Sequence, residues 1–168
     1  TGGFSTHEAS IAWFQSDAIE LVCVLFMLAG GISFALHFTV LKTLRFREYW
    51  QHAETRMYLV VVLVMSLVSA AYLVATNPQA AFVDRIMNAL FHVVSVTTTT
   101  GFATESFADW PAFLPVILIF LSIMGACAGS TSGGMKTVRV MMVFKQGMRE
   151  VSRIVHPNAV APVKLGDR

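Results

Sequence analysis

Two short stretches rich in threonine and glycine carry the residue types that bind a dehydrated monovalent cation. One is TGGFST, residues 1–6, and the other is TTTTGFAT, residues 97–104. Such a cation needs several oxygen ligands at once, and backbone carbonyls supply them without a full negative charge that would trap the ion. Glycine permits the positive φ that turns successive carbonyls toward one axis, and threonine adds a hydroxyl oxygen. The two turns therefore predict an ion-binding site; an ordinary β-branched turn is the alternative interpretation of TTTTGF.

Harder and softer metal ions fit this sequence less well. Neither stretch contains a carboxylate, which argues against calcium and magnesium. The five histidines and two cysteines are not spaced as a zinc site requires. We interpret Cys23 and Cys127, which lie in apolar runs, as small buried residues that need no disulfide. His92 is interpreted as a packed or solvated side chain.

A third polar stretch, GACAGSTSGG at residues 125–134, interrupts an apolar run that is too short to cross a bilayer. Lipid cannot satisfy free backbone N–H and C=O groups, so irregular backbone at that depth must be buried in protein or line a polar cavity. The stretch therefore predicts a pathway or a gate. Lys136 follows it and has two open interpretations, a gating element or a positively charged anchor at the cytoplasmic side.

The elements that position these stretches are predicted from apolar runs and charge. Hydrophobic residues make up 55% of the 168 and charged residues 13%, which favours a membrane protein. Residues 19–39 and 57–75 are each long enough for a spanning helix. Two basic clusters mark the cytoplasmic side, and the segments between them should face outward. The clusters are Lys42, Arg45, Arg47 and Arg56, and Lys136, Arg139, Lys145, Arg149 and Arg153.

The second half of the chain predicts a re-entrant segment and a broken helix. Residues 82–97 are apolar at helical spacing but too few to span, so we expect a pore helix that enters the membrane and returns through a filter turn at 98–102. We expect residues 112–153 to form a helix that is broken by an intramembrane loop at 125–134. Residues 156–168 are expected to form a cytoplasmic tail. The opening at Thr1 suggests a piece of a longer polypeptide.

An internal repeat with an offset of 98 residues organises these elements. It places Gly3 on Gly101 and Gly31 on Gly129. Each unit would be helix, pore helix, threonine-glycine turn and second helix, so residues 1–56 would end one unit and 57–155 hold the next. The predicted fold is an all-α integral membrane protein of channel-like repeats with re-entrant filter loops and one broken helix. We expect the helix over residues 19–39 to be continuous, so that only the corresponding helix of the second repeat contains a loop.

The chain resembles the Trk/Ktr/HKT superfamily of potassium transporters, and most closely its bacterial uptake subunits. The resemblance covers essentially the whole chain. It rests on TGGFST, MLAGGISFALHF (27–38), TTTTGFAT, GACAGSTSGGMKTVR (125–139) and REVSRIVHPNAVAPVKLG (149–166). That superfamily arranges four helix–pore helix–helix repeats around one pore, and each repeat contributes a filter turn with a key glycine. It also has an intramembrane loop below the filter that obstructs the closed pore.

The resemblance implies potassium uptake through a channel-like pore and no enzyme activity. It implies potassium as the transported ion, no tightly bound cofactor, contact with membrane lipid and no nucleic-acid binding. The multi-pass protein would lie in the bacterial inner membrane, with filters outward and basic loops in the cytoplasm, as a homodimer docked to a cytosolic nucleotide-binding regulatory ring. The implied filter residues are Thr1, Gly2, Gly3, Thr99, Thr100 and Gly101. The implied gate-loop residues are Gly125, Gly129, Ser130, Thr131, Ser132, Gly133, Gly134 and Lys136.

Two other functions stay open at this point. A secondary transporter with a mid-membrane solute site in the broken helix would share this architecture, but it leaves the paired turns unexplained. A nucleotide-binding enzyme is suggested by residues 129–137, which differ from the phosphate-loop pattern GxxxxGK[ST] by the intervening Met135. The apolar residues 115–124 would then be the preceding strand.

Overall fold

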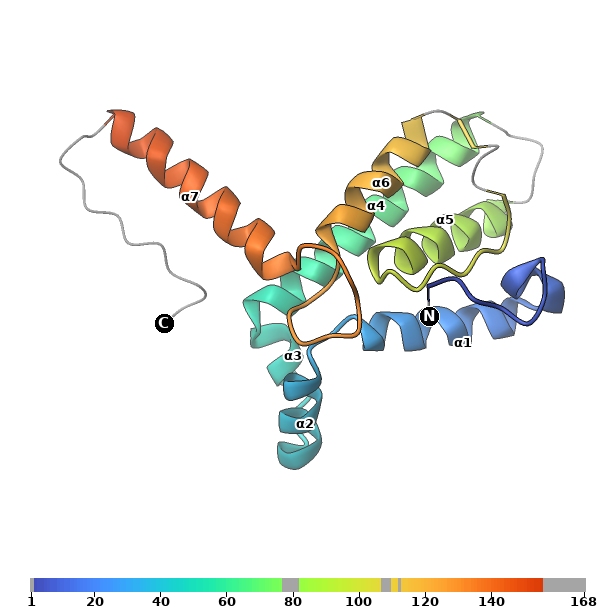
Figure 1. The fold of residues 1–168 in the computed structure, drawn as a ribbon, viewed down its shortest axis with the longest axis horizontal. Coiled ribbons are helices and arrows are strands. Elements are labelled where there is room, and N and C mark those ends of the chain that lie inside the picture. Colours follow the sequence, from blue (N-terminus) through green and yellow to red (C-terminus); the bar gives the residue numbers. More distant parts are fainter. Residues whose placement is uncertain (1, 77–81, 107–109, 112, 156–168) are drawn as a thin grey trace.

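The computed structural model describes residues 2–76, 82–106, 110–111 and 113–155, and all regular elements within these ranges are helical (Figure 1). Thr1 and the predicted tail at 156–168 lie outside the described residues. The elements are η1 (Ser10–Phe14), α1 (Asp17–Gly30), α2 (Phe34–Thr43), α3 (Arg47–Gln51), α4 (Ala53–Thr76), α5 (Phe82–Thr97), α6 (Phe113–Met124) and α7 (Thr137–Val155).

Helix α4 is long and apolar enough to cross a membrane by itself. Its 24 residues extend about 36 Å at 1.5 Å per residue, against a hydrocarbon core of about 30 Å. It starts four residues before the predicted run at 57–75 and ends one residue after it. Glu54 lies in its first turn, where a negative charge stabilises the N-terminal end of a helix.

The prediction of one continuous helix over residues 19–39 is wrong. Helix α1 ends at Gly30, the chain bends by 96°, and α2 begins at Phe34. At Gly31 the hydroxyl of Tyr58 on α4 occupies the space of a Cβ, so a larger residue would not fit. The helix is therefore broken in both predicted repeats. The two breaks differ in length, with residues 31–33 in the first and 125–136 in the second.

Helix α5 lies at the centre of the fold and has the bounds predicted from the sequence, residues 82–97. It packs against α1, α4 and α6, with α4 and α6 on one side and α1 on the other (Figure 1). Its last turns are buried on several faces as a result. At about 24 Å long the helix is too short to cross a bilayer, and its C-terminal end stops inside the protein.

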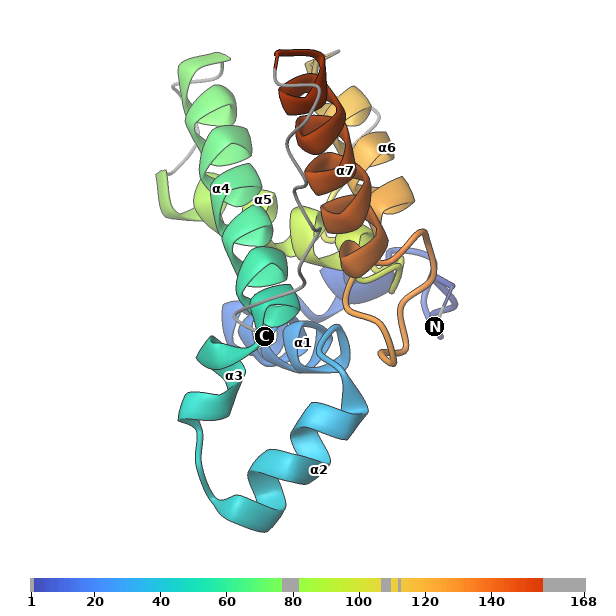
Figure 2. The ribbon, with the colours of Figure 1, turned by 90° about the vertical axis from the view of Figure 1, so that its left-hand side faces the viewer.

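The basic helices start near one another but point in different directions. Helices α2, α3 and α7 extend from the end where α4 begins, while η1 lies at the opposite end beside the start of α1 (Figure 1). In the turned view α2 and α3 form an arm below α1, and α4, α6 and α7 rise on the other side (Figure 2). Helices α1, α4 and α6 expose apolar side chains outward. Among them are Leu25, Phe26, Leu63, Leu67, Ile119 and Phe120.

Candidate functional site

The two threonine-glycine turns meet backbone to backbone, although they lie 98 residues apart in the sequence. The Gly3 N–H donates to the carbonyl oxygen of Thr100 at 2.8 Å. Gly3 and Gly101 have φ of 79° and 83°, a region that side chains other than glycine rarely adopt. A Cβ built on Gly101 would lie 2.7 Å from the Gly3 nitrogen, so only glycine fits at this contact. Gly2, with φ of 68°, belongs to the same junction.

The threonine hydroxyls hold the second turn on the C-terminal end of α5. The hydroxyls of Thr97 and Thr98 donate to the carbonyl oxygens of Val93 and Val94 at 2.7 and 2.8 Å. Both threonines are buried, which fixes the direction of the chain as it leaves the helix. Hydroxyls at these two positions therefore serve the turn itself, and the oxygens that remain for a ligand are chiefly backbone carbonyls.

Two electrostatic features make this junction suitable for a cation. The C-terminal end of α5 carries the partial negative charge of the helix dipole, and the turn follows it directly. The carbonyl oxygen of Thr100, which accepts the Gly3 N–H, lies at the contact between the two turns and adds a second partial negative charge there. No group of three His, Cys, Asp or Glu side chains suited to a metal occurs in the described ranges.

Thr99 joins the predicted filter turn to the predicted gate loop. Its φ of 54° is unusual and strained for a β-branched residue. In this conformation its Oγ1 accepts a hydrogen bond from the Gly133 N–H at 2.7 Å. The sequence predicted Thr99 as a carbonyl-bearing residue and did not predict this link. The loop therefore lies directly against the predicted filter turn.

The loop over residues 125–136 is built around three glycines in left-handed conformations. Gly125, Gly129 and Gly134 have φ of 65°, 71° and 76°. At Gly134 a Cβ would lie 2.9 Å from the carbonyl oxygen of Ser122 in α6, so a larger residue at this position would clash with α6. The backbone reverses sharply at these points, which is what glycine allows without strain.

Polar side chains satisfy backbone groups within the loop. The Ser132 hydroxyl accepts the Ala126 N–H at 2.9 Å, and the Ser130 hydroxyl donates to the Cys127 carbonyl at 2.6 Å. Lys136 has φ of 72°, and its ammonium group donates to the carbonyl of Ser132. Irregular backbone inside a membrane protein needs such partners, since lipid provides none.

The loop also pairs with the break between α1 and α2. In Figure 1 it lies beside the junction of these two helices. The hydrogen bonds join Phe34 N to Gly129 O at 3.0 Å, Cys127 N to Gly31 O at 3.0 Å, and Thr131 N to Gly30 O at 3.3 Å. Each break thus supplies partners for backbone groups that the other break frees, which is the physical reason that the first helix is not continuous.

Glu54 is a further residue of the site that sequence reasoning missed. Its Oε1 accepts the Ala128 N–H at 2.6 Å and the Val138 N–H at 3.2 Å. The carboxylate therefore connects α4 to the loop and to the first turn of α7. The available signal was weak: an acidic residue within a basic segment, just before an apolar run.

This carboxylate also argues against the nucleotide-binding alternative. A phosphate loop needs free N–H groups at the start of the following helix. At the start of α7 the Val138 N–H is already bound to Glu54. The segment at 115–124, which would have been the strand, lies in helix α6.

His92 is packed rather than solvated. It is 1% exposed, and its ring lies against Trp110 with centroids 4.9 Å apart. The ring nitrogens Nδ1 and Nε2 lie 2.9 and 3.1 Å from the carbonyl oxygens of Asn88 and Glu105. His92 therefore connects α5 to the segment that follows the predicted filter turn.

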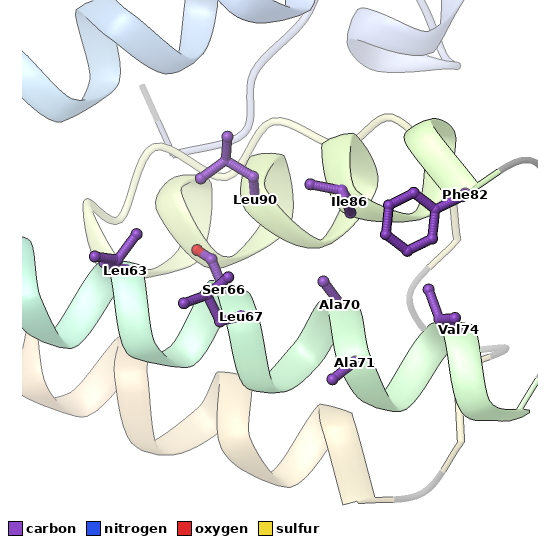
Figure 3. A pocket seen from close by; sticks show the side chains of 9 residues that line it. All are labelled: Leu63, Ser66, Leu67, Ala70, Ala71, Val74, Phe82, Ile86 and Leu90. Atoms are coloured by element: carbon purple, nitrogen blue, oxygen red, sulfur yellow. The ribbon is translucent and has the colours of Figure 1, made fainter.

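A hollow of about 530 Å³ lies between α4 and α5, away from the turns (Figure 3). Its lining is apolar apart from one serine, so it offers no set of oxygen ligands for an ion. The lining residues are Leu63, Ser66, Leu67, Ala70, Ala71, Val74, Phe82, Ile86 and Leu90.

Comparison with known proteins identifies the family. A sequence profile described as TrkH, a cation transport protein, matches residues 1–168. The chain belongs to the TrkH family of cation transport proteins. It is an all-α membrane protein, and its family is one of transporters rather than enzymes, as the sequence predicted.

Several TrkH-family relatives are similar over nearly the whole chain. The Trk system potassium uptake protein TrkH of Escherichia coli (strain K12) is 44% identical over 167 residues, 99% of this chain and 35% of the relative. The potassium uptake protein TrkG of the same organism is 32% identical over 167 residues, 99% of this chain and 34% of the relative. This chain therefore spans about a third of the length of these proteins.

The fold is also that of a solved TrkH-family structure. The crystal structure of the potassium transporter TrkH from Vibrio parahaemolyticus matches with a TM-score of 0.93 and 43% identity. The match covers 98% of this chain and 36% of that one. The bent helix pair, the central α5 and the broken helix therefore belong to an architecture found in a transporter.

Proposed function

We propose that this chain forms two adjacent walls of a potassium-selective filter, and the gate loop beneath them, in a protein that takes up potassium. The observation that carries the proposal is the backbone contact between Gly3 and Gly101, two left-handed glycines from corresponding turns. Family membership and the names of the relatives, which describe potassium uptake, support it. The filter residues would be those of the two turns, Thr1, Gly2, Gly3, Thr99, Thr100 and Gly101.

The backbone would perform the selection. Carbonyl oxygens of the two turns would replace part of the water shell of the ion, while the partial negative charge at the end of α5 lowers the cost of dehydration. The contact between the turns would fix the spacing of these oxygens, since the Gly3 N–H bonds to the Thr100 carbonyl and a Cβ at either Gly3 or Gly101 would meet the backbone of the other turn. Two further turns from outside this chain would complete the ring. Potassium is the transported ion here, and the proposal includes no resident cofactor.

The loop at 125–134, followed by Lys136, would obstruct the path below the filter. Its hydrogen bond to Thr99 supports a position next to the filter turn, and its three left-handed glycines would allow the backbone to rearrange at low cost. Ser130, Thr131 and Ser132 supply polar groups that would satisfy the backbone or line a wet path. Opening would require the contacts with Thr99, with the α1–α2 break and with Glu54 to be released.

The proposed orientation places the filter outward and the basic helices in the cytoplasm of a bacterial inner membrane. The charges on α2, α3 and α7, and the position of these helices next to the beginning of α4 in Figure 1, support it. Apolar faces of α1, α4 and α6 would contact lipid or the rest of the protein. The proposal also includes a homodimer. A cytosolic nucleotide-binding regulatory ring would dock on the basic helices of this protein.

The test uses the full-length protein that contains this chain, reconstituted in liposomes. We expect rubidium uptake that potassium inhibits at lower concentration than sodium does, relative to liposomes without protein. Solute-coupled transport without cation conduction would instead favour a secondary transporter and would contradict the filter assignment.

A further inference from the structure

The Glu54 carboxylate occupies a position that the filter and loop assignments do not explain. It projects from the first turn of α4, and its Oε1 accepts two backbone N–H groups, Ala128 at 2.6 Å and Val138 at 3.2 Å. Ala128 lies within the gate loop and Val138 in the first turn of α7. One side chain thus joins the loop, the helix after it and the membrane-spanning helix α4.

The strength of these contacts distinguishes Glu54 from the other anchors of the loop. Hydrogen bonds that involve an ionised group are about twice as strong as those between neutral groups. Among the residues outside the loop that bind it, Gly31 and Thr99 offer a neutral carbonyl and a neutral hydroxyl oxygen, whereas the charged Lys136 bonds to Ser132 within the same segment. At the start of α7 the carboxylate also interacts with the positive end of the helix dipole.

The geometry of the two ends of the loop gives these contacts a role in gating. The loop starts at the end of α6 and ends at α7, so its conformation depends on where α7 begins. Glu54 fixes that point relative to α4, which packs on both α5 and α7. The filter turn follows α5, so the same helix α4 supports the filter and the attachment of the gate.

We propose that Glu54 is the positioning residue that holds the gate loop in its closed position. This rests on the proposed function of the loop as a gate. Loss of the carboxylate frees the Ala128 and Val138 amides, which lets the loop and the start of α7 move away from α4. The closed state is then less populated, and ions pass without the normal opening signal.

The experiment compares Glu54→Ala, Glu54→Gln and a matched control, Glu150→Gln, in the full-length protein. Glu150 lies on α7 and pairs with Arg149 and Arg153, away from the loop. Two quantities are measured: hydrogen exchange of the amides in peptides covering residues 126–140, and rubidium uptake in liposomes without any activating partner.

For Glu54→Ala we expect exchange at residues 126–140 and basal uptake each to rise at least about tenfold, because the variant loses both charge-assisted hydrogen bonds and the loss of one already corresponds to about that factor. Glu54→Gln keeps an acceptor oxygen and should give an intermediate rise of about threefold. The potassium over sodium ratio should not change, because the filter contacts are intact. The control should match the wild-type protein in every measurement.

The proposal is overturned if exchange rises while basal uptake stays at the wild-type level, since Glu54 would then only cap α7. It is equally overturned if neither quantity changes. If Glu54→Ala does not fold, Glu54→Gln tests the proposal: an intermediate rise in exchange and uptake supports it, and wild-type values contradict it. A wild-type protein that shows no potassium-selective uptake would count against the proposed function itself, and the exchange data would still report whether Glu54 anchors the loop.

Discussion

Gly101→Ala tests the filter assignment most directly, because two independent penalties act at that position. With φ of 83°, any residue with a Cβ pays about 1–2 kcal/mol for the left-handed conformation. The new Cβ would lie 2.7 Å from the Gly3 nitrogen and 2.9 Å from the Gly3 Cα, whereas ordinary Cβ contacts begin at 3.4 Å. The turns must part by about 0.7 Å, and such overpacking costs about 1–3 kcal/mol.

The combined cost of about 2–5 kcal/mol falls on the backbone that would coordinate the ion. A selectivity ratio changes tenfold for a free-energy difference of about 1.4 kcal/mol. A part of this strain is therefore sufficient to change the selectivity measurably. We therefore expect the potassium over sodium permeability ratio of the full-length protein to fall at least about tenfold. Gly3→Ala should act in the same direction, because its Cβ would lie 2.9 Å from the Gly101 carbonyl oxygen.

The assay is the ratio of rubidium uptake inhibition by potassium and by sodium in liposomes. Gly147→Ala is the matched control, since a Cβ there meets nothing within 4 Å, and it should leave the ratio unchanged. An unchanged ratio in Gly101→Ala, in a protein that still folds and transports, would refute the assignment of these turns to the filter.

Three further changes test the loop and its contacts. Thr99→Val removes the acceptor of the Gly133 N–H and should raise basal rubidium uptake severalfold; uptake at the wild-type level would show that this bond does not hold the gate. Shortening residues 129–134 should also raise basal uptake, and a fall in a protein that remains folded would indicate a structural role for the loop. Gly134→Ala, whose Cβ would lie 2.9 Å from the Ser122 carbonyl oxygen, should lower the midpoint of thermal unfolding more than Gly133→Ala, where the nearest contact is 3.5 Å. Equal midpoints for these two variants would contradict the steric argument.

The sequence predicted the elements whose cause is local. Helix α5 has the predicted bounds, because its apolar spacing and the threonines that follow it are local signals. The break after α6 was predicted from glycines that directly follow an apolar run of 12 residues. The left-handed φ of Gly3 and Gly101 likewise follows from residue type, since the repeat places glycine at corresponding points of both turns.

The bend between α1 and α2 was not predictable in this way. Gly30 and Gly31 lie within a long apolar run, and such glycines commonly serve close packing of helices. Whether a helix breaks there depends on partners for the freed backbone groups, and the Gly31 carbonyl finds one in the Cys127 N–H. That partner lies in the other predicted repeat, so no short stretch of sequence around Gly31 contains it.

The sequence by itself determined the class of protein, the two turns and the place of the loop, because hydrophobic length, glycine positions and the 98-residue repeat are properties of the chain alone. Only the tertiary structure decided what these parts touch. The contacts of Glu54 with Ala128 and Val138 span 74 and 84 residues, and that of Thr99 with Gly133 spans 34. The physical reason is that backbone groups freed inside a membrane protein must be satisfied by whichever segment packs against them.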